Sequence, residues 1–91
     1  MVPHYRARAK KRDIEEPAIY SAIKRLGRPV MRLEPPLPDL LCETFKHRLV
    51  FLEVKSAKGK LTPSQEKFIR EWGSHVVVVR SVEEAIAALR S

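Results

Sequence analysis

The sequence has a single cysteine, Cys42, and no apolar run long enough to cross a membrane. One cysteine cannot form an internal disulfide, and no Cys and His residues are spaced like the ligands of a zinc site. A spanning helix needs about 18 or more apolar residues, and a secretory signal needs an apolar core before a small-residue cleavage site. We therefore expect a protein of the reducing cytoplasm that neither enters a membrane nor is exported.

Acidic residues are also few, because 11 Asp and Glu stand against 18 Lys and Arg, which leaves a formal charge of +7 and a pI near 10.0. Such a charge favours a polyanionic partner, since Lys and Arg neutralise phosphates and release counterions. Nucleic acid is the first candidate, while a basic surface that serves only solubility and an acidic protein partner are the alternatives. With 91 residues, the chain is expected to form one domain whose clefts are small or shared between subunits.

The first twelve residues, MVPHYRARAKKR, contain no acidic residue and show no apolar periodicity. This composition predicts a flexible basic arm over residues 1–12, followed by one folded domain over residues 13–91. The arm is expected to bind nucleic-acid phosphates through five side chains: Arg6, Arg8, Lys10, Lys11 and Arg12.

Apolar periodicity and capping signals predict seven elements after the arm. Asp13 is available as an N-cap for the first helix and Gly27 as its stop. Thr62 opens a capping box with proline at the first helical position. The all-valine run before Arg80 indicates a strand buried on both faces. The elements are helix 14–26, strand 30–34, a hairpin of strands 40–45 and 48–55, helix 63–72, strand 75–79 and helix 82–89.

The second strand of the hairpin, RLVFLEVK, places Glu53 and Lys55 on one face because side chains alternate along a strand. Asp39 follows Pro38 where the first strand of the hairpin begins, so the two carboxylates are expected to converge. Two hard oxygen donors at one point bind Mg²⁺ or Mn²⁺, and the lysine offsets their mutual repulsion. These groups suit metal-assisted attack of water on a phosphodiester.

Pro38-Asp39 followed by Glu53-Val54-Lys55 resembles the motif of the PD-(D/E)xK nuclease superfamily, whose core has the order αβββαβ. More narrowly, four ordered segments resemble the VRR-NUC (virus-type replication-repair nuclease) domain over about residues 12–89. They are Arg12-Asp13-x-x-Glu16-x-x-Ile19, PDLL, LEVK and LTPSQEKF. The resemblance implies an α/β protein with a restriction-endonuclease-like αβββαβ core, in which helices flank a mixed sheet, and a C-terminal helix.

Carried over by position, the resemblance also assigns the site. It implies metal binding by Asp39, Glu53, the carbonyl of Val54 and the helix glutamate Glu16, and catalytic roles for Glu16, Asp39, Glu53, Lys55 and Gln65.

Each assignment has a simpler alternative. Glu16 suits a helix dipole, Gln65 a helix cap, Lys55 a solvated strand end and Asp39 a turn. The chain departs from the family pattern at Glu15, where asparagine is frequent, and at Pro36-Leu37, where glycine usually precedes the Pro-Asp pair.

The resemblance implies an Mg/Mn-dependent endodeoxyribonuclease of phage or bacterial type. Lys58 and Lys60 are expected to assist the arm in binding DNA. Because so small a domain has little surface for DNA, we expect a homodimer. Single-domain proteins similar to this one are associated with four-way (Holliday) junctions, so branched DNA is the expected substrate, with flap or duplex nicking as an open alternative. The rival function is a non-catalytic nucleic-acid-binding module that retains the nuclease fold.

Overall fold

The computed structural model describes residues 13–91, so the predictions for the basic arm lie outside the described residues. None of the helices in this described part has the length and apolar character that crossing a bilayer requires. The elements occur in the predicted order: α2 (Glu16–Arg25), β1 (Val30–Arg32), β2 (Leu40–Glu43), β3 (Leu49–Val54), α3 (Pro63–Trp72), the 3₁₀ turn η1 (Gly73–His75), β4 (Val76–Val79) and α4 (Val82–Leu89).

The strands form one mixed sheet in the order β1-β2-β3-β4. β1 pairs antiparallel with β2, and β2 pairs antiparallel with β3 in a register that sets Leu40 opposite Leu52. β4 runs parallel to β3, and the connection between them contains α3. The αβββαβ core with a C-terminal helix is therefore confirmed.

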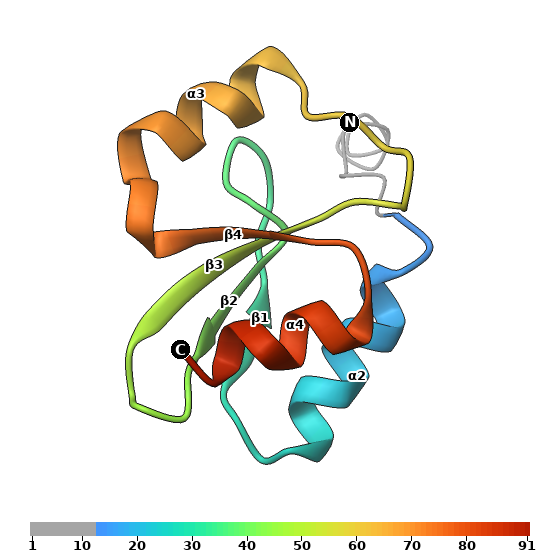
Figure 1. Cartoon of the computed structure of the whole chain (residues 1–91), viewed down its shortest axis with the longest axis vertical. Helices are drawn as coiled ribbons and strands as arrows, with labels where there is room; N and C mark the ends of the chain where they lie inside the picture. The colour runs from blue at the N-terminus through green and yellow to red at the C-terminus, as the bar shows by residue number, and fades with distance from the viewer. Residues whose placement is uncertain (1–12) are drawn as a thin grey trace, which may run out of the picture.

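Helices cover both faces of the sheet, with α2 and α4 on one side and α3 on the other (Figure 1). The main core lies between the sheet and the α2/α4 pair, because alternate residues of β3 turn toward these helices as predicted. On the opposite face Phe51 meets Phe68 and Trp72 of α3 edge-on, at ring distances of 5.3 and 6.0 Å. The main core consists of Ile19, Ile23, Leu40, Cys42, Val50, Leu52, Val54, Val79, Ala85, Ala88 and Leu89.

Two local predictions were wrong, and one helix is less buried than the others. α2 begins at Glu16 with Glu15 as its N-cap, because the carboxylate of Asp13 accepts a hydrogen bond from the Ser56 amide instead of capping the helix. β4 is an edge strand in which only Val79 is buried, so it is not covered on both faces. α3 contains no buried residue, and Trp72 is 48% exposed. This helix therefore covers one face of the sheet without adding a residue to the main core.

Candidate active site

Asp39 and Glu53 lie at the paired ends of β2 and β3. The antiparallel register ends with Leu40 opposite Leu52, so Asp39 and Glu53 are the next residues beyond this pair. Both side chains are only 4% exposed. Oδ2 of Asp39 accepts a hydrogen bond of 2.8 Å from the amide of Val54. The two predicted metal-binding acids therefore lie at the same end of the hairpin. The amide of Val54, directly after Glu53, orients the side chain of Asp39.

Gln65 joins the amino-terminal turn of α3 to this pair. Its Nε2 donates to Oε2 of Glu53 at 3.1 Å, while its Oε1 accepts from the Thr62 amide at 2.9 Å. The Gln65 amide in turn donates to Oγ1 of Thr62 at 3.2 Å, which completes the predicted capping box. Gln65 thus has both of the roles considered for it. Its side-chain oxygen caps the helix, and its side-chain nitrogen contacts the carboxylate of Glu53.

Glu16 occupies the first turn of α2 and is fully buried. Its two carboxylate oxygens accept from Nε and Nη2 of Arg32 at 2.9 and 3.1 Å. Arg32 also lies over the ring of Tyr20, with its guanidinium carbon 4.0 Å from the ring centre. The hydrogen bond to Glu16 raises the pKa of Arg32. Glu16 is therefore held by a two-point ion pair that ties α2 to β1.

The contacts of Glu16 with Arg32 do not show its carboxylate joining those of Asp39 and Glu53 as a third one. Within residues 13–91, no group of three or more His, Cys, Asp or Glu side chains is gathered as in a metal cluster. The metal-binding role of Glu16 stays a prediction.

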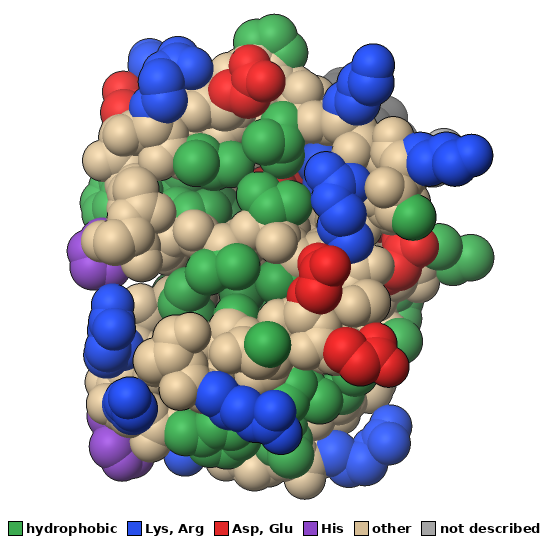
Figure 2. Space-filling model, in the orientation of Figure 1, with side chains coloured by type: hydrophobic (Ala, Val, Ile, Leu, Met, Phe, Trp, Pro, Cys, Tyr) green, Lys and Arg blue, Asp and Glu red, His purple; other side chains and the backbone are tan. Residues whose placement is uncertain are grey.

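Lys55 is half-buried directly after β3, and its main chain is fixed on two sides. Its amide donates to the carbonyl of Val79 at 3.0 Å, and the amide of the next residue, Ser56, donates to Asp13 at 3.0 Å. Lys58 and Lys60 are exposed in the segment that leads to α3. Figure 2 shows Lys and Arg side chains projecting along the upper right of the molecule, where this segment runs.

Two contributors to this end of the sheet escaped the sequence analysis, namely Arg32 and the Asp13–Ser56 tether. The contact of Arg32 with α2 could have been predicted in part, because side chains alternate along the strand VMRLE. This alternation places Arg32 on the same face as Leu40, which packs toward α2. Asp13 gave the opposite signal, since an aspartate before a helix is more often a cap.

Cys42 is 2% exposed, and burial raises the pKa of its thiol to about 11. A buried thiol of high pKa is a poor nucleophile, so Cys42 serves as a small apolar residue of the main core.

The donor chemistry at the hairpin end fits a hard divalent cation. Asp39 and Glu53 offer carboxylate oxygens, and the chain between Glu53 and Lys55 adds the carbonyl of Val54. Such all-oxygen sets suit Mg²⁺ and Mn²⁺, whereas sulfur and imidazole ligands select softer metals.

Comparisons with known proteins agree with this geometry. A solved structure described as a VRR_NUC domain superposes with a TM-score of 0.59 and 28% sequence identity, and the match covers 80% of this chain and 91% of the other. No protein-family model matches the sequence, and no curated protein matches it either. The structural match, the order of the elements and the converging Pro-Asp and Glu-x-Lys segments together identify the chain as a VRR-NUC domain with a nuclease fold.

Proposed function

We propose that the protein is a metal-dependent endonuclease that hydrolyses DNA phosphodiester bonds. The observation that carries this proposal is the pair of buried carboxylates, Asp39 and Glu53, at one end of the hairpin. Burying charged groups is unfavourable unless hydrogen bonds or ions compensate, and here the Val54 amide and the Gln65 side chain direct donors at the pair. An arrangement that concentrates and orients negative charge suits a cation site more than a structural core.

In the proposed mechanism, Asp39, Glu53 and the carbonyl of Val54 hold Mg²⁺ or Mn²⁺, with Glu16 as a further ligand. When bound, the ion supplies positive charge that offsets the charge developing on the phosphate. Lys55 lies two positions after Glu53 and on the same face of the chain, so its ammonium group can orient the attacking water or donate to a phosphate oxygen.

DNA is the proposed partner because the chain carries a formal charge of +7. Lys58 and Lys60 are exposed in the segment that follows Lys55, and residues 1–12 contain five further basic side chains. The sequence contains no motif for reading bases in the major groove, so we propose selection by DNA shape. Four-way junctions are the proposed preferred substrate, because similar single-domain nucleases act on them and two copies would present one site to each of two strands.

We further propose that the protein is a homodimer, formed through an apolar groove on the sheet. Two adjoining hollows of about 310 and 290 Å³ share Leu41 and Leu49 as lining residues. Met31, Leu49 and Trp72 in this lining are 54%, 63% and 48% exposed. An apolar face on a basic protein suits another protein surface more than DNA.

A second copy of the chain is the occupant that the charges of this groove favour. Lys24 and Glu43 both line the larger hollow. A two-fold contact sets the same face against itself, so Lys24 of one copy can approach Glu43 of the other, whose carboxylate also pairs with Arg28 of its own chain at 2.7 Å. This self-complementarity supports the homodimer.

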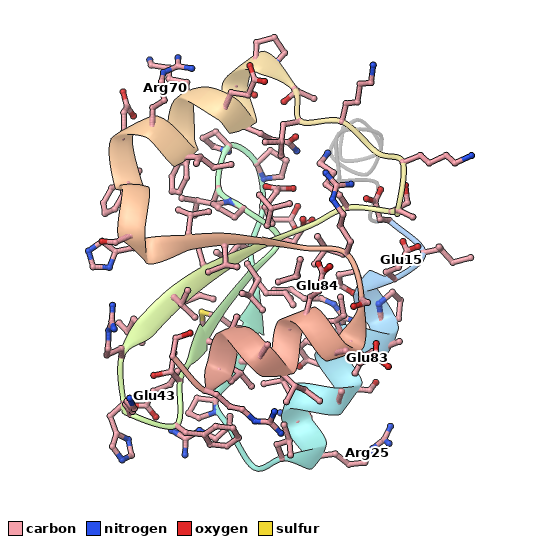
Figure 3. All side chains as sticks on the ribbon, viewed as in Figure 1. Glu15, Arg25, Glu43, Arg70, Glu83 and Glu84 are labelled. Carbon is pink, nitrogen blue, oxygen red and sulfur yellow. The ribbon has the colours of Figure 1, made fainter. Side chains whose placement is uncertain are left out.

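The test is cleavage of a four-way junction, a flap and a linear duplex with Mg²⁺, Mn²⁺ or EDTA. Glu53→Gln keeps an oxygen for the Gln65 contact but removes the charge, and Lys55→Ala removes the ammonium group. We expect metal-dependent cutting that favours the junction and falls roughly a hundredfold or more in both variants. Arg70→Ala, an exposed change on α3 (Figure 3), is the control with unchanged cutting. Equal cutting by all variants would contradict the assignment, and salt-dependent binding without cutting would identify a binding module.

A further inference from the structure

Arg80 follows β4 and reaches across to the segment that begins at Lys55. Its Nη1 donates to the carbonyl of Ser56 at 2.7 Å and to that of Gly59 at 2.8 Å, with a longer contact of 3.5 Å to Ala57. A single guanidinium nitrogen thus donates to three main-chain carbonyls of the turn formed by residues 56–59. No assigned role in the proposed site explains this contact.

The turn itself is tightly closed. The Gly59 amide donates to the carbonyl of Ser56 at 3.0 Å, so this carbonyl accepts from both the turn and the guanidinium. A Cβ atom at Gly59 would lie 3.0 Å from Oγ of Ser56, so the turn packs closely around this glycine. Carbonyl oxygens directed at one point repel each other unless a donor lies between them, and Arg80 provides that donor.

Arg80 is itself held in place by β4 and α4. Its amide donates to Oε1 of Glu84 at 2.7 Å, and Oγ of Ser81 caps α4 by accepting from the Glu84 amide at 3.1 Å. The residue before it, Val79, accepts from the Lys55 amide at 3.0 Å. Two successive residues of the β4 end therefore bind the main chain at Lys55 and the turn after it, so the guanidinium is a fixed anchor.

The turn presents positive charge to solvent. Lys58 and Lys60 are exposed, and Lys55 is half-buried. In the part of the chain from residue 13 onward, no salt bridge involves any of these three lysines. Arg80 adds a fourth positive charge at the centre of the turn. The carboxylates of Asp13 and Glu84 accept from the Ser56 and Arg80 amides and offset part of this charge, while the two exposed lysines remain available to a polyanion.

We propose that Arg80 is a positioning residue for DNA cleavage: by clamping the turn at residues 56–59, it fixes the directions in which Lys55, Lys58 and Lys60 meet the phosphate backbone. This inference rests on the proposed nuclease function. Misplacing catalytic groups by about 1 Å can cost about a hundredfold in rate, so an unclamped turn is expected to slow cleavage while leaving the fold intact.

The test compares Arg80→Met and Arg80→Lys with Arg25→Met. Arg25 lies at the end of the molecule opposite α3 (Figure 3), so its replacement removes the same charge without touching the turn. Lysine is expected to restore function, because all contacts come from one nitrogen and an ammonium group has three donors. Should Arg80→Met fail to fold, Arg80→Gln replaces it as a neutral, polar variant.

Three measurements decide the outcome. First, hydrogen exchange of the protein alone should accelerate at least tenfold at Gly59 in Arg80→Met, with the β3 amides unchanged. Second, the slope of log affinity against log salt for duplex DNA in EDTA should fall by about 1 to 2 more than in Arg25→Met, which corresponds to one or two lost phosphate contacts. Third, single-turnover cleavage should slow roughly ten- to a hundredfold, with recovery in Arg80→Lys.

Unchanged exchange at residues 56–59 in Arg80→Met would overturn the proposal. So would losses of cleavage that follow the melting temperature alone, or a salt slope equal to that of Arg25→Met. If the wild-type protein cuts no DNA, the nuclease function fails, while exchange and the salt slope still decide whether Arg80 positions the lysines.

Discussion

Gln65 offers a sharp test of the site, because one side chain both caps a helix and contacts a buried carboxylate. Three variants separate these roles. Thr62→Ala removes the hydroxyl that accepts from the Gln65 amide but leaves the contact to Glu53. Gln65→Ala removes both. Gln65→Glu keeps an oxygen for the Thr62 amide but sets a carboxylate against Glu53.

The expected magnitudes follow from the exposure of each contact. The capping bonds lie at the surface, so Thr62→Ala should cost about 1 kcal/mol of unfolding free energy and little activity. Glu53 is 4% exposed, and a hydrogen bond to a charged group contributes about 1.5–3 kcal/mol. If that contact orients the carboxylate during catalysis, Gln65→Ala should slow cleavage roughly ten- to a hundredfold.

In Gln65→Glu the oxygen that caps the helix is kept, but the contact to Glu53 becomes repulsive. Two carboxylates about 4 Å apart repel by about 4 kcal/mol at an effective dielectric of about 20, so one takes up a proton or the new side chain turns away. This repulsion outweighs a helix cap worth about 1 kcal/mol, so the variant should be no more stable than Gln65→Ala and should cleave no faster.

The assay pairs urea unfolding with single-turnover cleavage of the same DNA. Rates that simply follow stability across the three variants would show that Gln65 is only a cap. A divergence, with Thr62→Ala destabilised yet active, supports the double role.

Two further predictions concern residues away from the carboxylates. Burial raises the pKa of the Cys42 thiol from 9.0 to about 11, so at pH 8 its thiolate is about a hundredfold scarcer than in the unfolded chain. Alkylation of the folded protein should be slower by at least that factor and accelerate as the pH rises toward 11, and equal rates in urea and buffer would contradict this. Leu49→Asp in the apolar groove should convert a dimer to a monomer in light scattering, whereas Leu26→Asp, a similar change at a leucine 43% exposed, should not; a monomeric wild type would refute the groove as an interface.

Local signals predicted the residues of the hairpin end well. The alternation of RLVFLEVK and the Pro-Asp start of β2 depend on strand geometry, which fixes the face of each side chain from its parity alone. The capping box at Thr62 was equally readable, because its two bonds join residues three positions apart. Short-range rules therefore identified the two acids and Lys55 as members of one region, whereas the site role of Gln65 came from the family resemblance.

Contacts between distant segments were not readable in this way. Arg32 reaches Glu16 across 16 positions, Asp13 reaches Ser56 across 43, and Arg80 reaches Ser56 across 24. In each case the residue type fits a surface charge or cap equally well, and only the packing of α2 and β4 against the sheet selects the partner. The burial of the valine strand β4 was overestimated for a similar reason. Sequence periodicity does not distinguish an inner strand from an edge strand, and β4 lies at the edge of the sheet.

These long-range contacts converge on the main chain on either side of the Glu-x-Lys segment. The Val54 amide donates to Asp39, the Lys55 amide to Val79 and the Ser56 amide to Asp13. Three successive amides thus bind three separate parts of the chain, so the strand end that carries Glu53 and Lys55 is fixed before any ligand arrives. Preorganisation of this kind lowers the ordering cost of binding a cation and a phosphate. A chain of 91 residues buries only a small core, so such main-chain tethers add rigidity that its side-chain packing cannot supply alone.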